Sequence, residues 1–339
     1  MKLHWLLLLL IGVFACRSTP RTITPAFYYW KSNFNPTEFE KRKLHSLGVE
    51  TVYVKLFDIA WDPQQQKALP VAKIFIRDTA HLNNKKIIPT VFITNEVFYN
   101  LDSVGVQVLA QNTASLIKKY LTGFSKKAAE IQMDCDWTNI TKQKYFFFLQ
   151  TIKTAFPQQM LSATIRLHQV KYTASSGIPP VNRGLLMCYN MGNLQDEKAT
   201  NSIIDPVEFE KYRPYIKTYP LPLDVGLPLF SWHVLFRENK YAGLIQTLST
   251  TALQRFKNIG TNRYEVMQDT IILGKALKAG DVLRYEESPI NSLQKIAGSL
   301  SRQLTQQPIN AVFYHCDSVI LNKYNTYELE EIFGRLRHH

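Results

Sequence analysis

Two aspartates in the stretch EIQMDCDWTNI, residues 130–140, combine a residue type and a spacing that could do chemistry. Asp134 and Asp136 stand two positions apart in a run that otherwise resembles a buried β-strand. Alternate residues of a strand point to the same face, so the two carboxylates share one face, with roughly 6.5–7 Å between their backbones. Carboxyl pairs about 5–9.5 Å apart serve as acid and base, or acid and nucleophile, in glycoside hydrolysis.

Eight short β-rich runs alternate with helical segments along the chain, and the two aspartates belong to the fourth run. The runs are apolar at nearly every position, which suits strands that are buried on both faces of a parallel sheet. They span residues 26–30, 51–59, 86–94, 130–137, 161–167, 184–191, 223–230 and 309–316. This alternation predicts an α/β fold, a (β/α)8 TIM barrel. The alternative is an open doubly wound sheet, but the glycine-rich phosphate turn of that fold is missing from the sequence.

The chain has 339 residues, more than a minimal barrel needs, and the surplus follows the seventh run. Segment 237–287 contains its own strand-like pieces around a Gly280-Asp281 turn. We therefore expect a barrel over residues 26–339 that carries a small α+β subdomain inserted over residues 237–287.

The first 15 residues have the features of a secretory signal peptide. Lys2 precedes an apolar run over residues 6–14 that is too short to span a membrane, and small Ala15 precedes Cys16. The sequence VFAC at residues 13–16 resembles the bacterial lipoprotein signal, in which the cysteine becomes the lipidated first residue. An ordinary signal peptide that happens to contain a cysteine is the alternative.

This resemblance implies a signal peptide over residues 1–15 and a lipidated linker over residues 16–25. Through the lipid on Cys16 the protein would be anchored to a membrane of the bacterial cell envelope. Arg17, rather than an aspartate, follows the cysteine. By resemblance to proteobacterial lipoproteins, that favours sorting to the outer membrane.

The formal net charge is +13, and hydrophobic residues make up 45% of the chain against 20% charged residues, as in globular proteins. A basic secreted protein can meet anionic lipid, polysaccharide or nucleic acid. No run of lysines and arginines is long enough for a nucleic-acid-binding arm. We therefore expect no nucleic-acid partner and interpret the charge as general surface chemistry.

Three further cysteines support the barrel. Cys135, Cys188 and Cys316 fall on the fourth, sixth and eighth runs, which are not neighbours. If the polar residues beside each cysteine point into the barrel, the cysteines point outwards to the helices and cannot reach one another. We expect free, buried thiols.

The active sites of such barrels lie at the C-terminal ends of the strands. Flat aromatic faces with polar neighbours suit sugar rings. Tryptophans that merely close the barrel mouth are the alternative interpretation. The candidate ligand-binding residues at the strand ends are Trp30, Asp58, Trp61, Glu96, Trp137, Asn190, Trp232 and Asp317.

The segment MDCDWT, residues 133–138, resembles the fourth-strand motif Asp-x-Asp-x-Glu of glycoside hydrolase family 18, the chitinase and endo-N-acetylglucosaminidase family. The segment MCYN, residues 187–190, resembles the Met-x-Tyr-Asp motif of the sixth strand. The resemblance implies a carbohydrate or glycan ligand and no cofactor. It places Asp134, Asp136 and Tyr189 at catalytic positions.

The glutamate that protonates the glycosidic oxygen in that family is replaced by Thr138, and Asn190 replaces the sixth-strand aspartate. A threonine hydroxyl cannot act as a carboxylic acid near neutral pH. The chain also resembles uncharacterised bacterial lipoproteins with such a barrel that lack the glutamate. Two hypotheses follow: a glycosidase with a rearranged acid/base pair, for which Asp58, Glu96 and Asp317 are further candidate acids, or a glycan-binding lipoprotein without catalysis.

Two other interpretations of the aspartates stay open. They could be structural and bonded to Arg166 or to the backbone. Asp134, Asp136, His168, His315 and Asp317 could instead hold a divalent metal. The close-spaced histidine pair of barrel metal sites is absent from the sequence, so we predict no metal.

Overall fold

The computed structural model describes residues 20–76, 85–123, 128–246, 248–305 and 308–337. The predicted signal peptide over residues 1–15 and the candidate lipidation site Cys16 lie outside these described residues. Within them, no helix has the length and apolar character that crossing a membrane requires.

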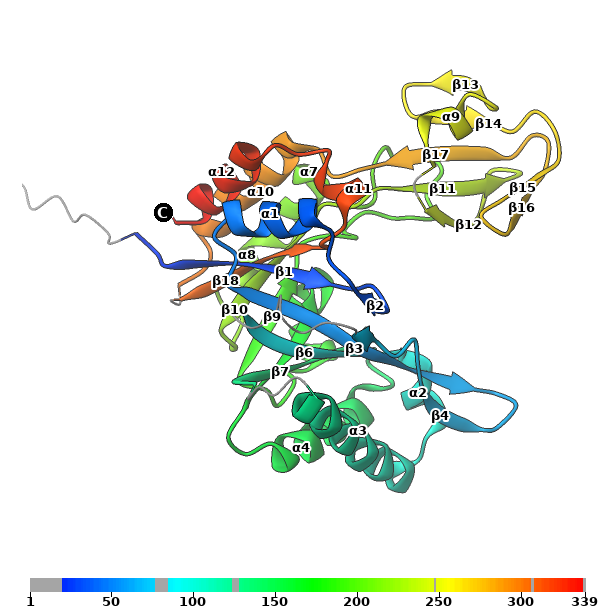
Figure 1. Ribbon diagram of the computed structural model, residues 1–339. Coiled ribbons are helices and arrows are strands. Elements are labelled where there is room, and N and C mark those ends of the chain that lie inside the picture. Colours follow the sequence, from blue (N-terminus) through cyan, green and yellow to red (C-terminus); the bar gives the residue numbers. More distant parts are fainter. Residues whose placement is uncertain (1–19, 77–84, 124–127, 247, 306–307, 338–339) are drawn as a thin grey trace, which may run out of the picture.

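A closed barrel of parallel strands forms the body of the molecule (Figure 1). Around the barrel the strands follow the order β1, β18, β10, β9, β8, β7, β6, β3, and β3 pairs again with β1. Closure excludes the open doubly wound sheet and confirms the predicted TIM barrel. The strands are β1 (Ile23–Tyr29), β3 (Thr51–Asp62), β6 (Lys86–Ile93), β7 (Glu130–Asp134), β8 (Met160–Arg166), β9 (Arg183–Met187), β10 (Leu223–Pro228) and β18 (Ile309–Tyr314).

Amphipathic helices cover the outside of the barrel. The N-terminus of α1 shows how the sequence starts one: Thr37 accepts from the Glu40 N–H while the Glu40 carboxylate accepts from the Thr37 N–H, forming a capping box. The longer helices are α1 (Glu38–Ser46), α3 (Ser103–Gly123), α4 (Lys142–Ala155), α10 (Ile290–Ser301) and α12 (Thr326–Arg337). Shorter ones are α2 (Asn95–Asn100), α5 (Leu167–Lys171), α6 (Thr173–Ser176), α7 (Pro206–Glu210), α8 (Arg213–Ile216) and α11 (Ser318–Leu321).

Short strands extend the sheet at the C-terminal end of β3. The strand β4 (Lys67–Val71) forms an antiparallel hairpin with the end of β3. The strands β2 (Asn33–Phe34) and β5 (Phe75–Ile76) pair with each other nearby.

Side-chain alternation along β7 decides which residues face the barrel axis. Gln132 accepts a hydrogen bond from the Tyr28 hydroxyl of β1, a strand that is not its neighbour, so Gln132 must point inwards. Asp134, two residues further, points the same way and accepts from Thr164 of β8. Cys135 is buried as a free thiol, as are Cys188 and Cys316, which confirms the expectation for all three.

A separate lobe projects beyond the C-terminal ends of the barrel strands (Figure 1). Its five-stranded sheet has the order β12, β11, β17, β14, β13, and a small core around Leu235 and Leu283 packs against it. The elements are β11 (Trp232–Arg237), β12 (Lys240–Gln246), α9 (Thr250–Leu253), β13 (Lys257–Gly260), β14 (Arg263–Glu265), β15 (Thr270–Ile272), β16 (Lys275–Leu277) and β17 (Val282–Glu286). The lobe begins at Trp232 rather than at residue 237, because β11 pairs antiparallel with β17 instead of continuing the barrel.

The chain enters the barrel beside the end of its last helix. Arg21 is 2% exposed, and its backbone N–H donates to the carbonyl of Arg337 at 2.9 Å. Its guanidinium donates to the carbonyls of Leu336 at 2.9 Å and Ser301 at 3.1 Å, and also to that of Leu304. This side chain therefore joins the start of β1 to the ends of α10 and α12.

Arg21→Ala should destabilise the fold by roughly 2–4 kcal/mol, because it leaves buried helix-end carbonyls without their charged donor. Urea denaturation followed by circular dichroism measures the change. Arg42→Ala, on the exposed face of α1, is the matched control and should change stability by less than about 0.5 kcal/mol. Equal stabilities of the two variants would show that Arg21 does not hold the chain ends together.

Candidate functional site

A cavity of about 710 Å³ opens at the C-terminal ends of the barrel strands. The aspartates Asp134 and Asp136 and the tyrosine Tyr189 all line it, so the two sequence motifs meet in one place. Four of the candidate ligand-binding residues also line it: Trp30, Asn190, Trp232 and Asp317. The cavity receives Gln246 from the lobe as well, so barrel and lobe both shape it.

Asp134 is the buried carboxyl of the cavity. It is 4% exposed, and its Oδ1 accepts a hydrogen bond of 2.6 Å from the Thr164 hydroxyl. Burial raises the pKa of Asp134 to about 7, and the negative charge of Asp136 acts in the same direction, whereas the Thr164 bond opposes the rise. Near neutral pH this group therefore exists in both protonated and ionised forms.

Asp136 is held by a bidentate ion pair with Arg166. The Arg166 Nε and Nη2 atoms donate to its two carboxylate oxygens at 2.5 and 2.7 Å. The Asp136 side chain is 49% exposed, so it is not buried with Asp134. The same guanidinium lies over the ring of Tyr189, 5.8 Å from its centroid. One arginine thus fixes both the second aspartate and the sixth-strand tyrosine.

Aromatic rings form a continuous wall of the cavity. Tyr314 lies 5.5 Å from Trp30 and 6.0 Å from Tyr189, measured between ring centroids. Phe230 lies 5.7 Å from Tyr189 and 5.2 Å from Trp232. Tilted and edge-on rings of this kind stabilise one another and keep their free faces in fixed orientations.

The lobe holds Trp232 in position. Its indole N–H donates to Glu286 at 2.8 Å, and the same carboxylate oxygen accepts from the Ser202 hydroxyl at 2.6 Å. The other oxygen of Glu286 accepts from Arg284 at 2.8 Å, and both side chains of that ion pair are fully buried. A buried network of satisfied hydrogen bonds therefore supports the outer wall of the cavity.

Neighbouring groups at the start of α11 and Lys31 occupy the carboxylate of Asp317. It caps α11 by accepting from the N–H groups of Val319 and Ile320, and it pairs with Lys31 at 2.9 Å. Burial by itself would raise the pKa of Asp317, but the Lys31 ammonium and the helix N–H groups outweigh it and lower the pKa. Asp317 is therefore ionised and poorly suited to donate a proton.

Several predicted residues do not line the cavity. Asp58 pairs with Lys55 at 2.8 Å, and Glu96 is exposed on the first turn of α2. Trp61 extends into the hairpin with β4. Trp137 is 2% exposed, stacks on Tyr145 of α4 and donates to the Ser176 carbonyl, so it points outwards to the helices.

Thr138 stands where glycoside hydrolase family 18 has its proton-donating glutamate, and it does not line the cavity. Its backbone N–H and hydroxyl bond with the Thr141 hydroxyl at 2.9 and 3.2 Å. Thr141 in turn donates to Asn95 at 2.5 Å. The residue therefore closes the turn before α4 and presents no group to a ligand in the cavity.

Some cavity residues were not singled out by the sequence. Tyr314 and Phe230 stand at the ends of the eighth and seventh strands, so their positions carried the same signal as the tryptophans. Gln246 comes from the lobe and Lys323 follows α11, and no sequence pattern points from either residue to the site. Across the described ranges, no group of three or more histidine, cysteine, aspartate or glutamate side chains is arranged to hold a metal ion.

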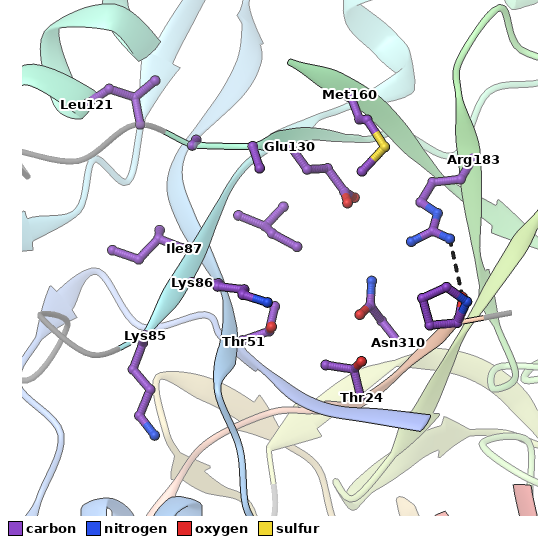
Figure 2. Close-up of a pocket in the computed structure, with 14 residues that line it drawn as sticks. Thr24, Thr51, Lys85, Lys86, Ile87, Leu121, Glu130, Met160, Arg183 and Asn310 are labelled. Atoms are coloured by element: carbon purple, nitrogen blue, oxygen red, sulfur yellow. Dashed lines mark hydrogen bonds between the residues drawn. The ribbon is translucent and has the colours of Figure 1, made fainter. Parts of the chain in front are cut away.

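A second cavity, of about 430 Å³, lies at the opposite end of the barrel, where the strands begin (Figure 2). Glu130 faces it and accepts a 2.5 Å bond from Ser162, and burial raises the pKa of Glu130 to about 7. Arg183 lines the same cavity and pairs with buried Asp224 at 3.2 Å. None of the predicted site residues is among those that line it.

Asp134→Asn should reduce the pH dependence of stability. The native pKa of about 7 lies above the ordinary value of 3.8, so the native state holds this proton more tightly than the unfolded chain does. The resulting stability is fully present below about pH 4 and is lost as the pH rises through about 7. Between pH 4 and pH 8 the wild type should lose up to about 4 kcal/mol more than the variant in urea denaturation.

Glu130 and Asp224, whose pKa values burial raises to about 7 and about 6, change stability in the same direction in both proteins. The difference between wild type and variant therefore isolates Asp134. Identical pH profiles would contradict the elevated pKa.

Solved structures with the same barrel match this chain over most of its length. The spore cortex-lytic enzyme SleL of Bacillus cereus has a TM-score of 0.56 and 15% identity, covering 94% of this chain and 75% of that chain. Chitinase from Chromobacterium violaceum has a TM-score of 0.53 and 12% identity, covering 92% and 97%. YKL-39, solved in the presence of chitooligosaccharides, has a TM-score of 0.50 and 11% identity, covering 92% and 99%.

No family profile matches the chain, and no curated protein sequence is significantly similar to it. At such low sequence identities, the structural similarity supports a common fold and nothing beyond it. The chain therefore has the barrel of the chitinase-type proteins that its fourth-strand and sixth-strand motifs resemble, and the recognition made from the sequence is confirmed at that level.

Proposed function

We propose that this protein binds a carbohydrate chain in the cavity at the barrel mouth and does not cleave it. The main support is what occupies the positions that are catalytic in glycoside hydrolase family 18. Thr138 replaces the proton-donating glutamate and does not line the cavity, and Asp136 is bound to Arg166. The aromatic wall and the polar groups beside it remain available to a ligand.

The wall suits a glycan because sugar rings have one apolar face and a rim of hydroxyl groups. Trp30, Tyr314 and Trp232 offer flat apolar surfaces, and Asn190 and Lys323 offer hydrogen-bonding groups beside them. Two of the structural neighbours are called a chitinase and a cortex-lytic enzyme, and the third was solved with chitooligosaccharides. Oligomers of N-acetylglucosamine are therefore the first ligands to test.

The proposal against cleavage follows from the pairing of the carboxyl groups. A glycosidase needs one carboxyl with a raised pKa and a second that is free to act on the sugar or on water. Asp136 and Asp317 line the cavity, but Arg166 and Lys31 hold them as partners in ion pairs. Asp134 has the raised pKa but lacks a free second carboxyl.

Hydrolysis is the second candidate function, and the raised pKa of Asp134 favours it. A carboxyl with a pKa of about 7 is suited to proton donation near neutral pH. Hydrolysis would require Arg166 to release Asp136 when the substrate binds.

Chitooligosaccharides should bind to the wild type, and Trp232→Ala should weaken the binding by about tenfold through the loss of one stacking surface. Isothermal titration calorimetry measures both affinities. Trp61→Ala removes a tryptophan of similar exposure that does not line the cavity, so it should leave the affinity unchanged. An equal loss in both variants, or the absence of binding, would contradict the assignment of this cavity.

Product analysis on the tightest ligand separates binding from hydrolysis. We expect no released oligosaccharide from the wild type. If products appear and Asp134→Asn abolishes them without changing the affinity, hydrolysis is the function, because the loss then falls on the transition state.

We also propose that Cys16 is acylated and anchors the protein to a membrane of the cell envelope. The support is the signal-like sequence before it, which lies outside the described residues. Cys16→Ser should move the protein from the membrane fraction to the soluble fraction, and mass spectrometry should find lipid on the wild-type cysteine alone. Unchanged partitioning of the variant would reject the anchor.

A further inference from the structure

The two ends of the barrel differ in charge. In this fold the helices run opposite to the strands, so the helices end where the strands begin (Figure 1). Exposed carbonyl groups at helix C-termini favour basic side chains. The exposed basic residues at that end, which we call the basic pole, are Lys86, Lys118, Lys119, Lys153, Lys217, Arg302, Arg335 and Arg337.

Carboxylates neutralise only part of this pole. Glu331 pairs with Arg335 at 2.6 Å, the positive charge of Arg302 helps to lower the pKa of Glu210, and Glu50 is exposed, whereas Glu130 and Asp224 are buried. Acidic residues gather instead at the opposite end, where helices begin: Glu38, Glu96, Asp102, Asp205, Glu208 and Asp317. The positive charge of the chain is thus displaced along the barrel axis towards the pole.

The pole is a ring rather than a groove. Its residues lie on β6, α3, α4 and α12 or directly follow α8 and α10, and these elements are distributed around the barrel. Lys86 also lines the cavity shown in Figure 2, so positive charge reaches towards the centre of the ring. A ring of this shape fits a flat anionic surface better than a linear polyanion, which a charged groove would follow.

The start of the chain leaves the barrel at the same end. Buried Arg21 fixes the chain there, and the strand β1 starts two residues later. The backbone from Cys16 to Arg21 can extend over at most about 18 Å. An acyl group on Cys16 would therefore hold the pole within that distance of a bilayer.

We propose that the basic pole docks onto anionic phospholipid headgroups, so that the carbohydrate cavity faces away from the membrane. The orientation rests on the acylation of Cys16 proposed above, whereas the lipid affinity of the pole does not. Each basic residue near an anionic bilayer strengthens binding by roughly fivefold, and salt screens the attraction within about 8–10 Å.

The test uses the mature chain, residues 16–339, with Cys16→Ser so that it cannot be acylated. The protein should cosediment with phosphatidylcholine vesicles that contain about 30% phosphatidylglycerol, and about 0.5 M NaCl should abolish this binding. It should not cosediment with vesicles of phosphatidylcholine alone. The variant Lys119→Glu/Lys153→Glu/Lys217→Glu should bind at least about tenfold more weakly.

The matched control, Lys198→Glu/Lys240→Glu/Arg255→Glu, makes the same change in net charge on exposed residues of the lobe and its neighbouring loop. It should retain most of the binding. Equal losses in the two variants, equal binding to neutral vesicles, or binding to heparin in place of anionic vesicles would overturn the proposal. If the pole variant melts at a lower temperature, the corresponding Lys→Gln triple replaces it and should still lose binding.

Failure of this proposal can be told apart from failure of the proposed function. Chitooligosaccharide affinity of the pole variant reports only on the cavity and should equal that of the wild type. Partitioning of the full chain with Cys16 intact reports only on the anchor.

Discussion

Closure of the barrel between β1 and β3 is the constraint on which the rest of the structure depends. Once eight parallel strands form a ring, every second side chain must face the axis and the others must face the helices. The β7 strand therefore sends Gln132 and Asp134 inwards, and the next residue, Cys135, is buried as a free thiol. Because all strands are parallel, their C-terminal ends form one mouth, and residues far apart in sequence meet there.

The ion pair between Asp136 and Arg166 connects this geometry to function. In a glycosidase the second carboxylate of the site must be free to act on the substrate. Here Arg166 of β8 donates two hydrogen bonds to Asp136, at 2.5 and 2.7 Å, and the guanidinium also lies over the ring of Tyr189. Asp136 thus holds Arg166 against the wall of the cavity, which agrees with the proposed binding without turnover.

The helix directions give the barrel a second kind of polarity. Acidic residues at helix N-termini and basic residues at helix C-termini each interact favourably with the helix dipoles. In a (β/α)8 barrel all these dipoles point the same way, so local preferences add up to two ends of different charge. The cavity lies at one end and the entry of the chain at the other, which joins the two proposals into one arrangement on a membrane surface.

The sequence by itself determined the fold, because the apolar runs and helical stripes that build a barrel are local patterns with fixed periods. It also determined that Asp134, Asp136 and Tyr189 stand at the ends of the fourth and sixth strands. Only the tertiary structure decided that Arg166 holds Asp136 and that Trp137 turns outwards, because pairing across strands depends on register and side-chain direction. Composition gave the net charge, whereas its displacement to one end arises only when separate helix termini are brought together in space.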